Sequence, residues 1–225
     1  MRSLFVTVVA VMIAVLVVPL MIPGNCTAAS GLGVKIGLAF AKQDWSYSDQ
    51  VFKFDNSYRQ GLGLGVFIEQ PLIPSFAVRA EGMLVQKGFK VNVIQTDYNG
   101  QPIPRTTDLK YRIDYFTLDL LGKASFPSGT YVLAGPRLDL KLGKKASAAN
   151  ILSQELEDKF SSTIFGWTLG LGQSLTLTPK IGLFVEGQYY LDQGKLYDKS
   201  NNGTATGPLE TIKNKSFALF AGIRF

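Results

Sequence analysis

Eight segments after Ser30 alternate between apolar side chains and polar or small ones, and this pattern constrains the fold more than any other feature. Strict alternation is typical of β-strands whose two faces meet different surroundings. Each segment is close to the about 9–11 residues with which a tilted strand crosses a bilayer. The apolar faces fall within residues 32–40, 62–68, 76–84, 116–126, 132–140, 165–177, 181–191 and 217–225.

The connections between these segments alternate in length. Short turns are expected at residues 70–75, 127–129 and 178–180, whereas the joins at 42–57, 88–112, 143–163 and 192–215 are long and polar. Short turns at one end and long loops at the other are typical of outer-membrane barrels. Because eight is an even number, both ends of the barrel sheet then lie on the short-turn, periplasmic side.

The face of each strand opposite the apolar one shows which face points inward. This opposite face mixes glycines with charged side chains, which suits a crowded interior better than a surface in contact with solvent. In lipid, a closed barrel is the only β-structure that pairs every backbone group. We therefore predict an all-β, eight-stranded, antiparallel up-and-down transmembrane β-barrel. The side chains expected to form an ion-pair network in its lumen are Arg79, Glu81, Asp119, Lys123, Arg137, Asp139, Glu186 and Arg224.

Large inward residues should fill this lumen, because an eight-strand barrel is only just wide enough for its side chains. Those expected to block it are Arg79, Met83, Phe184, Tyr190 and Phe220. The strand faces carry an excess of Lys and Arg, so an open lumen would favour anions. Aromatic residues available for the membrane interfaces are Phe126, Tyr131, Trp167, Tyr189 and Phe225.

The short turns also predict the register of two hairpins. If Phe126 pairs with Thr130, Asp119 faces Arg137 and Thr117 faces Asp139, and an Asp119–Arg137 ion pair is expected. Across the turn at residues 178–180, Gly172 would face Glu186 and Gly170 would face Gln188.

Residues 1–28 are predicted to be a signal peptide. A basic start precedes the apolar run of residues 4–22, and small residues follow Pro23 and Gly24. Cleavage is expected after Ala28 or Ala29, which leaves residues 29–225 as the barrel domain. A transmembrane anchor and a lipoprotein acylated at Cys26 are the alternatives.

The chain contains no His and one Cys, which removes several kinds of chemistry. A Ser-His or Cys-His nucleophile, a His base and a cysteine zinc site cannot be built. The glycines at 61, 63 and 65 lie inside a strand and do not have the spacing of a phosphate-binding loop. We expect no catalytic residue, no metal and no cofactor, and the net charge of +6 is not concentrated in a patch that would bind nucleic acid.

The long loops are where binding residues are expected. The candidates are the aromatic residues Trp45, Tyr47, Phe52 and Phe54; loop self-packing is the competing interpretation. Leu152, Leu156 and Phe160 have helical spacing, which indicates a short helix over the barrel mouth. A tight turn expected at residues 99–100 indicates that its two strands project beyond the membrane.

Several short motifs resemble the PorT-like family of bacterial outer-membrane β-barrel proteins. They lie at residues 79–81, 86–88, 115–123, 134–136, 185–189 and 222–225 and together span most of the predicted barrel. Asp119 and Gln188 depart from the family's usual proline and arginine. The resemblance implies a barrel, and it implies that Phe225 is the terminal aromatic residue recognised by the barrel-assembly machinery.

The sequence as a whole predicts a monomeric, non-enzymatic protein of the Gram-negative outer membrane, exported through the periplasm. Its expected partners are outer-membrane lipid and lipopolysaccharide, the assembly machinery, and a surface or secretion partner. Its loops would serve envelope integrity, adhesion or assembly. A small porin-like channel for ions or hydrophobic solutes is the alternative, and an accessory role in secretion is a second alternative implied by the family's name.

Overall fold

A computed structural model of the chain describes residues 31–47, 56–96, 102–146, 160–178, 181–198 and 209–225. Its strands are β1 (Gly31–Tyr47), β2 (Asn56–Ile73), β3 (Phe76–Thr96), β4 (Pro102–Ser125), β5 (Thr130–Ala146), β6 (Thr163–Thr178), β7 (Ile181–Asp192), β8 (Tyr197–Asp198) and β9 (Leu209–Arg224). Among these residues, no helix has both the length and the hydropathy needed to cross a membrane.

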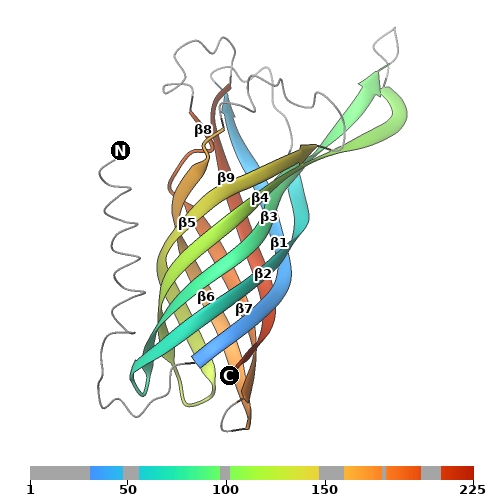
Figure 1. Cartoon of the computed structure of the whole chain (residues 1–225). Helices are drawn as coiled ribbons and strands as arrows, with labels where there is room; N and C mark the ends of the chain where they lie inside the picture. Colours follow the sequence, from blue (N-terminus) through green and yellow to red (C-terminus); the bar gives the residue numbers. More distant parts are fainter. Residues whose placement is uncertain (1–30, 48–55, 97–101, 147–159, 179–180, 199–208) are drawn as a thin grey trace.

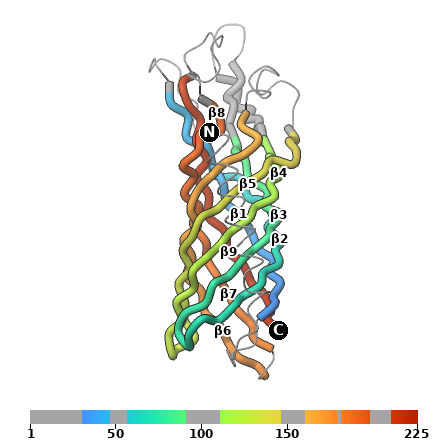
Figure 2. Tube along the Cα trace, turned by 60° about the vertical axis from the view of Figure 1, so that its left-hand side comes forward, coloured from blue at the N-terminus to red at the C-terminus, as the bar shows by residue number. Residues whose placement is uncertain are grey.

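Eight antiparallel strands form a closed barrel (Figures 1 and 2). Neighbouring strands pair in chain order from β1 to β7, β7 pairs with β9, and β9 pairs with β1 to close the circle. The two-residue strand β8 lies beside β9 where β7 has ended. The predicted eight-stranded up-and-down barrel is therefore confirmed.

The short turns and the C-terminus lie at one end of the barrel, which we call the turn end (bottom of Figure 1). At the opposite end, the loop end, the longer connections leave the strands. In the turn between β4 and β5, Phe126 N–H donates to the Thr130 carbonyl at 2.8 Å and Gly129 has a φ of 82°. That φ suits glycine because it has no Cβ. Asp119 then pairs with Arg137 and Gly172 with Glu186, as predicted.

The strands are longer than the sequence indicated. They were expected to have about 9–11 residues, but β4 has 24 and β3 has 21. The additional residues come from the segments predicted to be loops. A strand can continue in water once it leaves the membrane, because its neighbour still satisfies its backbone, and the polar composition of these segments concealed that pairing. The predicted projection of β3 and β4 is confirmed (Figure 1).

The apolar faces point outward, as predicted. Leu62, Leu171 and Leu175 are all more than half exposed on the outside of the barrel. Four of the five expected interfacial aromatic residues are also exposed, namely Phe126, Trp167, Tyr189 and Phe225. Tyr131 is the exception, since it is 1% exposed and points into the lumen, which corrects the interfacial assignment.

Inward glycines make room for the large side chains of the lumen. A Cβ on Gly172 would lie 2.2 Å from the Tyr131 ring, and one on Gly33 would lie 2.2 Å from the Phe67 ring. Gly222 stands in the same relation to Phe184. Small residues opposite large ones are how narrow barrels fill their interior, so the glycine-rich strands are a packing device.

Candidate functional site

The lumen holds ten charged side chains that are at most 5% exposed. Five are basic and five are acidic, namely Lys35, Arg79, Lys87, Lys123 and Arg137, and Glu69, Glu81, Asp119, Asp139 and Glu186. Charges at this depth persist only when they are paired. The balance of signs corrects the expectation of a basic lumen among the described residues, and the charges form two networks at different heights.

Arg79 is the centre of the network nearer the turn end, which we call the lower network. Its guanidinium donates to Glu69 at 2.9 and 3.0 Å, to Glu186 at 2.8 Å and to Glu81 at 3.2 Å. Lys35 bridges two of these carboxylates, at 2.6 Å from Glu81 and 3.1 Å from Glu186. Each charge therefore meets more than one opposite charge, which is the condition under which buried ions are tolerated.

Further side chains complete the lower network. Lys123 Nζ lies 2.9 Å from Glu69, and Arg224 reaches the same carboxylate at 3.4 Å from the open turn end. Tyr131 donates its hydroxyl to Glu186 at 2.9 Å, and the Gln188 amide donates to Glu186 at 2.8 Å. These contacts fix the orientation of carboxylates that would otherwise be free to turn.

The second network, the upper network, lies nearer the loop end. Asp139 accepts from Lys87 at 2.5 Å and from the Thr117 hydroxyl at 2.6 Å, and Arg137 Nε lies 3.3 Å from it. Arg137 also donates to Asp192 of β7. The upper network thus ties β3, β4, β5 and β7 together across the lumen.

Asp119 does not form the predicted ion pair. The two Cα atoms are paired in the sheet as expected, but Asp119 accepts a hydrogen bond from the Thr168 hydroxyl at 2.6 Å. The Arg137 guanidinium is directed instead to Asp139 and Asp192. Register decides which residues are neighbours, whereas the long arginine side chain can choose among several carboxylates.

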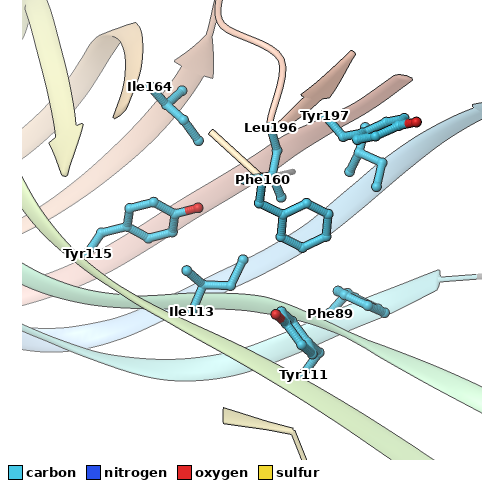
Figure 3. Close-up of a cluster of buried hydrophobic side chains, with 9 residues drawn as sticks. Phe89, Tyr111, Ile113, Tyr115, Phe160, Ile164, Leu196 and Tyr197 are labelled. Atoms are coloured by element: carbon cyan, nitrogen blue, oxygen red, sulfur yellow. The ribbon is translucent and has the colours of Figure 1, made fainter. Parts of the chain in front are cut away.

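An apolar cluster closes the lumen at the loop end (Figure 3). Figure 3 shows the Phe160 ring between side chains from several strands, with Phe89 and Tyr111 on one side and Leu196 on another. The cluster, which we call the aromatic cap, consists of Phe89, Tyr111, Ile113, Tyr115, Phe160, Ile164, Leu196, Tyr197 and Ile212. Because it lies above the upper network, apolar packing separates the ionic lumen from the loops.

Trp45 belongs to this cap and not to an exposed loop. It lies in β1, is partly buried against the cap, and meets the Phe89 ring edge to face at 5.4 Å. This corrects the prediction that it is a loop binding residue. Tyr47 is the last residue of β1, and Phe52, Phe54, Leu152 and Leu156 lie outside the described residues, as do Cys26, Ala28 and Ala29.

Seven of the eight predicted network residues are buried in the lumen, Arg224 lies at its open turn end, and the prediction omitted four further members. Lys35, Glu69 and Lys87 occupy inward positions of the alternating pattern, so the pattern could have identified them. Asp192 was assigned to a loop because the apolar alternation ends just before it, and only the three-dimensional closure of the barrel brings it to Arg137.

A small recess lies in the lower lumen beside Arg79. This recess of about 20 Å³ lies between Arg79, Lys123 and Arg224 at the turn end, which is room for about one water molecule. Within the described ranges, no group of three or more His, Cys, Asp or Glu side chains has the arrangement of a metal site. The arrangement can therefore hold strands together, and it leaves little room for a solute beside Arg79.

A closed barrel with an apolar outside and an ionic inside is the architecture of an integral outer-membrane protein. The chain belongs to the family described as "Outer membrane protein beta-barrel domain", whose profile matches residues 26–192. Membership places the chain in the bacterial outer membrane. The match supports an outer-membrane β-barrel family, and the PorT-like resemblance stays a prediction.

Several solved outer-membrane proteins have a similar arrangement. Ail of Yersinia pestis is 16% identical over 88% of this chain and all of its own, with a TM-score of 0.43. OprG of Pseudomonas aeruginosa is 16% identical, over 88% of this chain and 96% of OprG, with a TM-score of 0.44. The outer membrane protease OmpT of Escherichia coli is 12% identical, over 91% of this chain and 99% of OmpT, with a TM-score of 0.43. Among curated protein sequences there is no match.

Proposed function

We propose that this protein is a closed, non-enzymatic outer-membrane barrel that acts through the surface it presents outside the cell, in envelope integrity, adhesion or assembly with a partner. The observation that carries the proposal is the filled lumen. Two ion networks and an aromatic cap occupy successive levels of it. A barrel closed in this way is a rigid support, and its outer surface is the part left to meet other molecules.

The side chains favour a non-enzymatic role. The chain has no histidine, and the carboxylates Glu81, Asp139 and Glu186 each accept hydrogen bonds from buried cations. A carboxylate held in this way is not positioned to exchange protons with a substrate. The pairing of β1 with β9 favours a monomer, because it joins the first and last strands of the barrel wall and leaves neither as an edge for a second copy.

The β3–β4 hairpin is the described feature best placed to meet a partner. Its pairing continues beyond Lys90 and Lys110 to Thr96 and Pro102, so it projects past the barrel rim (Figure 1). A paired hairpin keeps its shape outside the membrane, which lowers the entropic cost of binding relative to a flexible loop. We propose that this projection carries the contact surface.

Shortening the hairpin tests this proposal. Val91 pairs with Leu109, so residues 92–108 can be replaced by Asn-Gly without changing the register below. In a strain lacking the wild-type protein, we expect the shortened barrel to fold, as judged by its gel shift on boiling, but not to restore adhesion or detergent resistance. A variant with only residues 97–101 replaced by Gly and Ser is the control. Full restoration by the shortened barrel would contradict the proposal.

A small channel is the second candidate function, and the polar lining of the lumen is the observation that favours it. Conduction would require Arg79, Lys123 and Arg224 to move aside from the turn-end recess. Recording the current across a planar bilayer separates the two functions, since a closed barrel carries none.

Two further proposals concern export and assembly; the apolar N-terminal segment supports the first, and the resemblance to the PorT-like family supports the second. We infer that the signal peptide is removed after Ala28 or Ala29, and that Phe225 is recognised by the barrel-assembly machinery. Phe225 is exposed and its backbone pairs with Leu32 beside the closing seam. Slower insertion of a Phe225→Ala variant in cells, with normal refolding in detergent, would support recognition. Equal insertion would contradict it. An accessory role in secretion is the further implication of the same resemblance.

A further inference from the structure

One sector of the outer wall combines aromatic rings with lysines at the outer edge of the membrane. The rings of Phe40 on β1 and Phe217 on β9 stack with centroids 4.9 Å apart, and Tyr58 of β2 meets Phe217 edge to face at 5.8 Å. Tyr189 of β7 pairs with Phe217 in the sheet and is 44% exposed. Aromatic side chains gather where a membrane protein passes the lipid headgroups, so this row indicates the outer interface.

A group of charges follows directly above this row, on the same two strands. We call it the seam cluster, and it consists of Lys42 and Asp44 of β1 and Lys213 and Lys215 of β9. Lys42 is directly opposite Lys215 in the sheet, an arrangement of like charges that is unfavourable by itself. Asp44 relieves part of it, since its carboxylate lies 2.5 Å from Lys215 and 3.9 Å from Lys42.

The seam cluster keeps an excess of positive charge that faces the lipid headgroups. Three lysines share one carboxylate, and the side chains of Lys42 and Lys215 are 31% and 51% exposed. On β4, Arg112 and Asp114 pair with each other at 2.9 Å, and Lys145 lies opposite Arg112 in the sheet. The seam cluster differs in that its excess of lysines lies directly above the aromatic row.

We propose that the seam cluster binds the phosphate of a phosphorylated glycolipid of the outer leaflet, whose acyl chains lie along the aromatic row. The headgroup phosphates of that leaflet lie at the height of the cluster, and phosphate accepts charge-assisted hydrogen bonds from lysine. A second anion there satisfies the lysines that Asp44 alone does not neutralise. Lys42 also lies 5.3 Å from the Tyr58 ring, which holds its stem along the wall. The inference rests on the proposed function only in requiring the barrel to stand in the outer membrane with its loop end outward.

Native mass spectrometry of the refolded barrel in detergent micelles tests the inference with bisphosphorylated lipid A as the probe. The Lys42→Gln, Lys213→Gln, Lys215→Gln triple variant removes the excess charge from exposed positions. At roughly fivefold per lysine near an anionic surface, we expect the affinity to fall at least about tenfold. The control is the Lys144→Gln, Lys145→Gln, Lys195→Gln triple variant, which removes the same number of positive charges outside the seam cluster. It should bind lipid A with the affinity of the wild type. Equal weakening in both triple variants would overturn the inference.

A second variant tests the role of the carboxylate. Asp44→Asn removes the anion that competes with phosphate, so lipid A should bind more tightly. Asp114→Asn makes the same charge change beside Arg112 and should leave binding unchanged. A loss of affinity in Asp44→Asn, or an equal gain in both variants, would contradict a phosphate site at the seam.

The probes also separate the sources of phosphate. We expect dephosphorylated lipid A to bind at least about tenfold more weakly, and inorganic phosphate not to displace the lipid. Displacement by inorganic phosphate would show a free-anion site, and equal binding of dephosphorylated lipid would show that the phosphate plays no part; either result overturns the inference. Conductance recorded on the same preparation tests the closed lumen separately, so failure of one does not imply failure of the other.

Discussion

Replacing Arg79 with Met tests whether the lower network stabilises the barrel. The guanidinium makes four hydrogen bonds of 2.8–3.2 Å to three carboxylates and lies 4.3 Å from the Phe67 ring. Methionine keeps the stem but leaves three buried carboxylates short of one cation. Removing one member of a buried ion pair costs about 3–5 kcal/mol, so we expect the free energy of unfolding to fall by about that amount.

Equilibrium urea unfolding in lipid vesicles, followed by the fluorescence of Trp45 and Trp167, measures this change. With a slope of about 2 kcal/mol per molar urea, the midpoint should fall by about 2 M. Arg224→Gln is the matched control, because Arg224 contacts the same Glu69 at 3.4 Å but has a side chain that is 44% exposed. The Arg224–Glu69 pair should contribute less than about 1 kcal/mol to the free energy of unfolding.

A double variant identifies the cause of the loss. If uncompensated buried charge is what destabilises Arg79→Met, adding Glu186→Gln should destabilise the protein less than the two single changes summed. Strict additivity, or a loss in Arg79→Met no larger than in Arg224→Gln, would refute the view that the lower network is a linked set of buried charges.

Three further predictions concern packing and the upper network. Gly135→Ala should lower the free energy of unfolding by more than about 2 kcal/mol, because a Cβ would lie 1.9 Å from the Leu120 carbonyl oxygen. Gly187→Ala is the control, because a Cβ there would lie 3.5 Å from its nearest neighbour; it should lower the free energy of unfolding by less than about 1 kcal/mol in the same urea assay. Asp139→Asn should lower the free energy of unfolding by about 3 kcal/mol, because Asp139 accepts a hydrogen bond from Lys87 and contacts Arg137. Asp119→Asn should lower it by about 1 kcal/mol, because Asp119 accepts a hydrogen bond from the Thr168 hydroxyl. The reverse order in the urea assay would contradict the assigned networks. In a Trp167→Phe background, Trp45 emission should be shifted to short wavelength and resist quenching by iodide, and quenching like that of free tryptophan would contradict its place in the aromatic cap.

The faces of the strands and the register of two hairpins could be predicted from the sequence because both follow from local rules. Alternation with a period of two determines which side chains point inward, and a short turn determines which residues face each other. Asp119 is therefore expected opposite Arg137 and Glu186 opposite Gly172, and the sheet pairs them in this way. The alternation also places Arg79, Lys123 and Arg224 on the inner face.

The pairing of charges across the lumen could not be predicted in the same way. Arg137 reaches Asp192, which is on β7 and two strands away, because the closed barrel brings their side chains together. The predicted strands are also shorter than the observed ones. Strands that continue outside the membrane need no apolar face, so the alternation of apolar residues does not reveal their full length. Trp45 was misplaced for this reason, since its segment is polar in sequence and paired in space.

Single-channel recording of the refolded barrel in a planar bilayer distinguishes a closed lumen from an open one. A gel shift between boiled and unboiled samples first shows that the protein has folded. We expect no conductance steps, because the lower network, the upper network and the aromatic cap occupy the lumen at successive levels. Stable, reproducible steps that change when Lys123 or Arg137 is replaced would contradict a closed lumen.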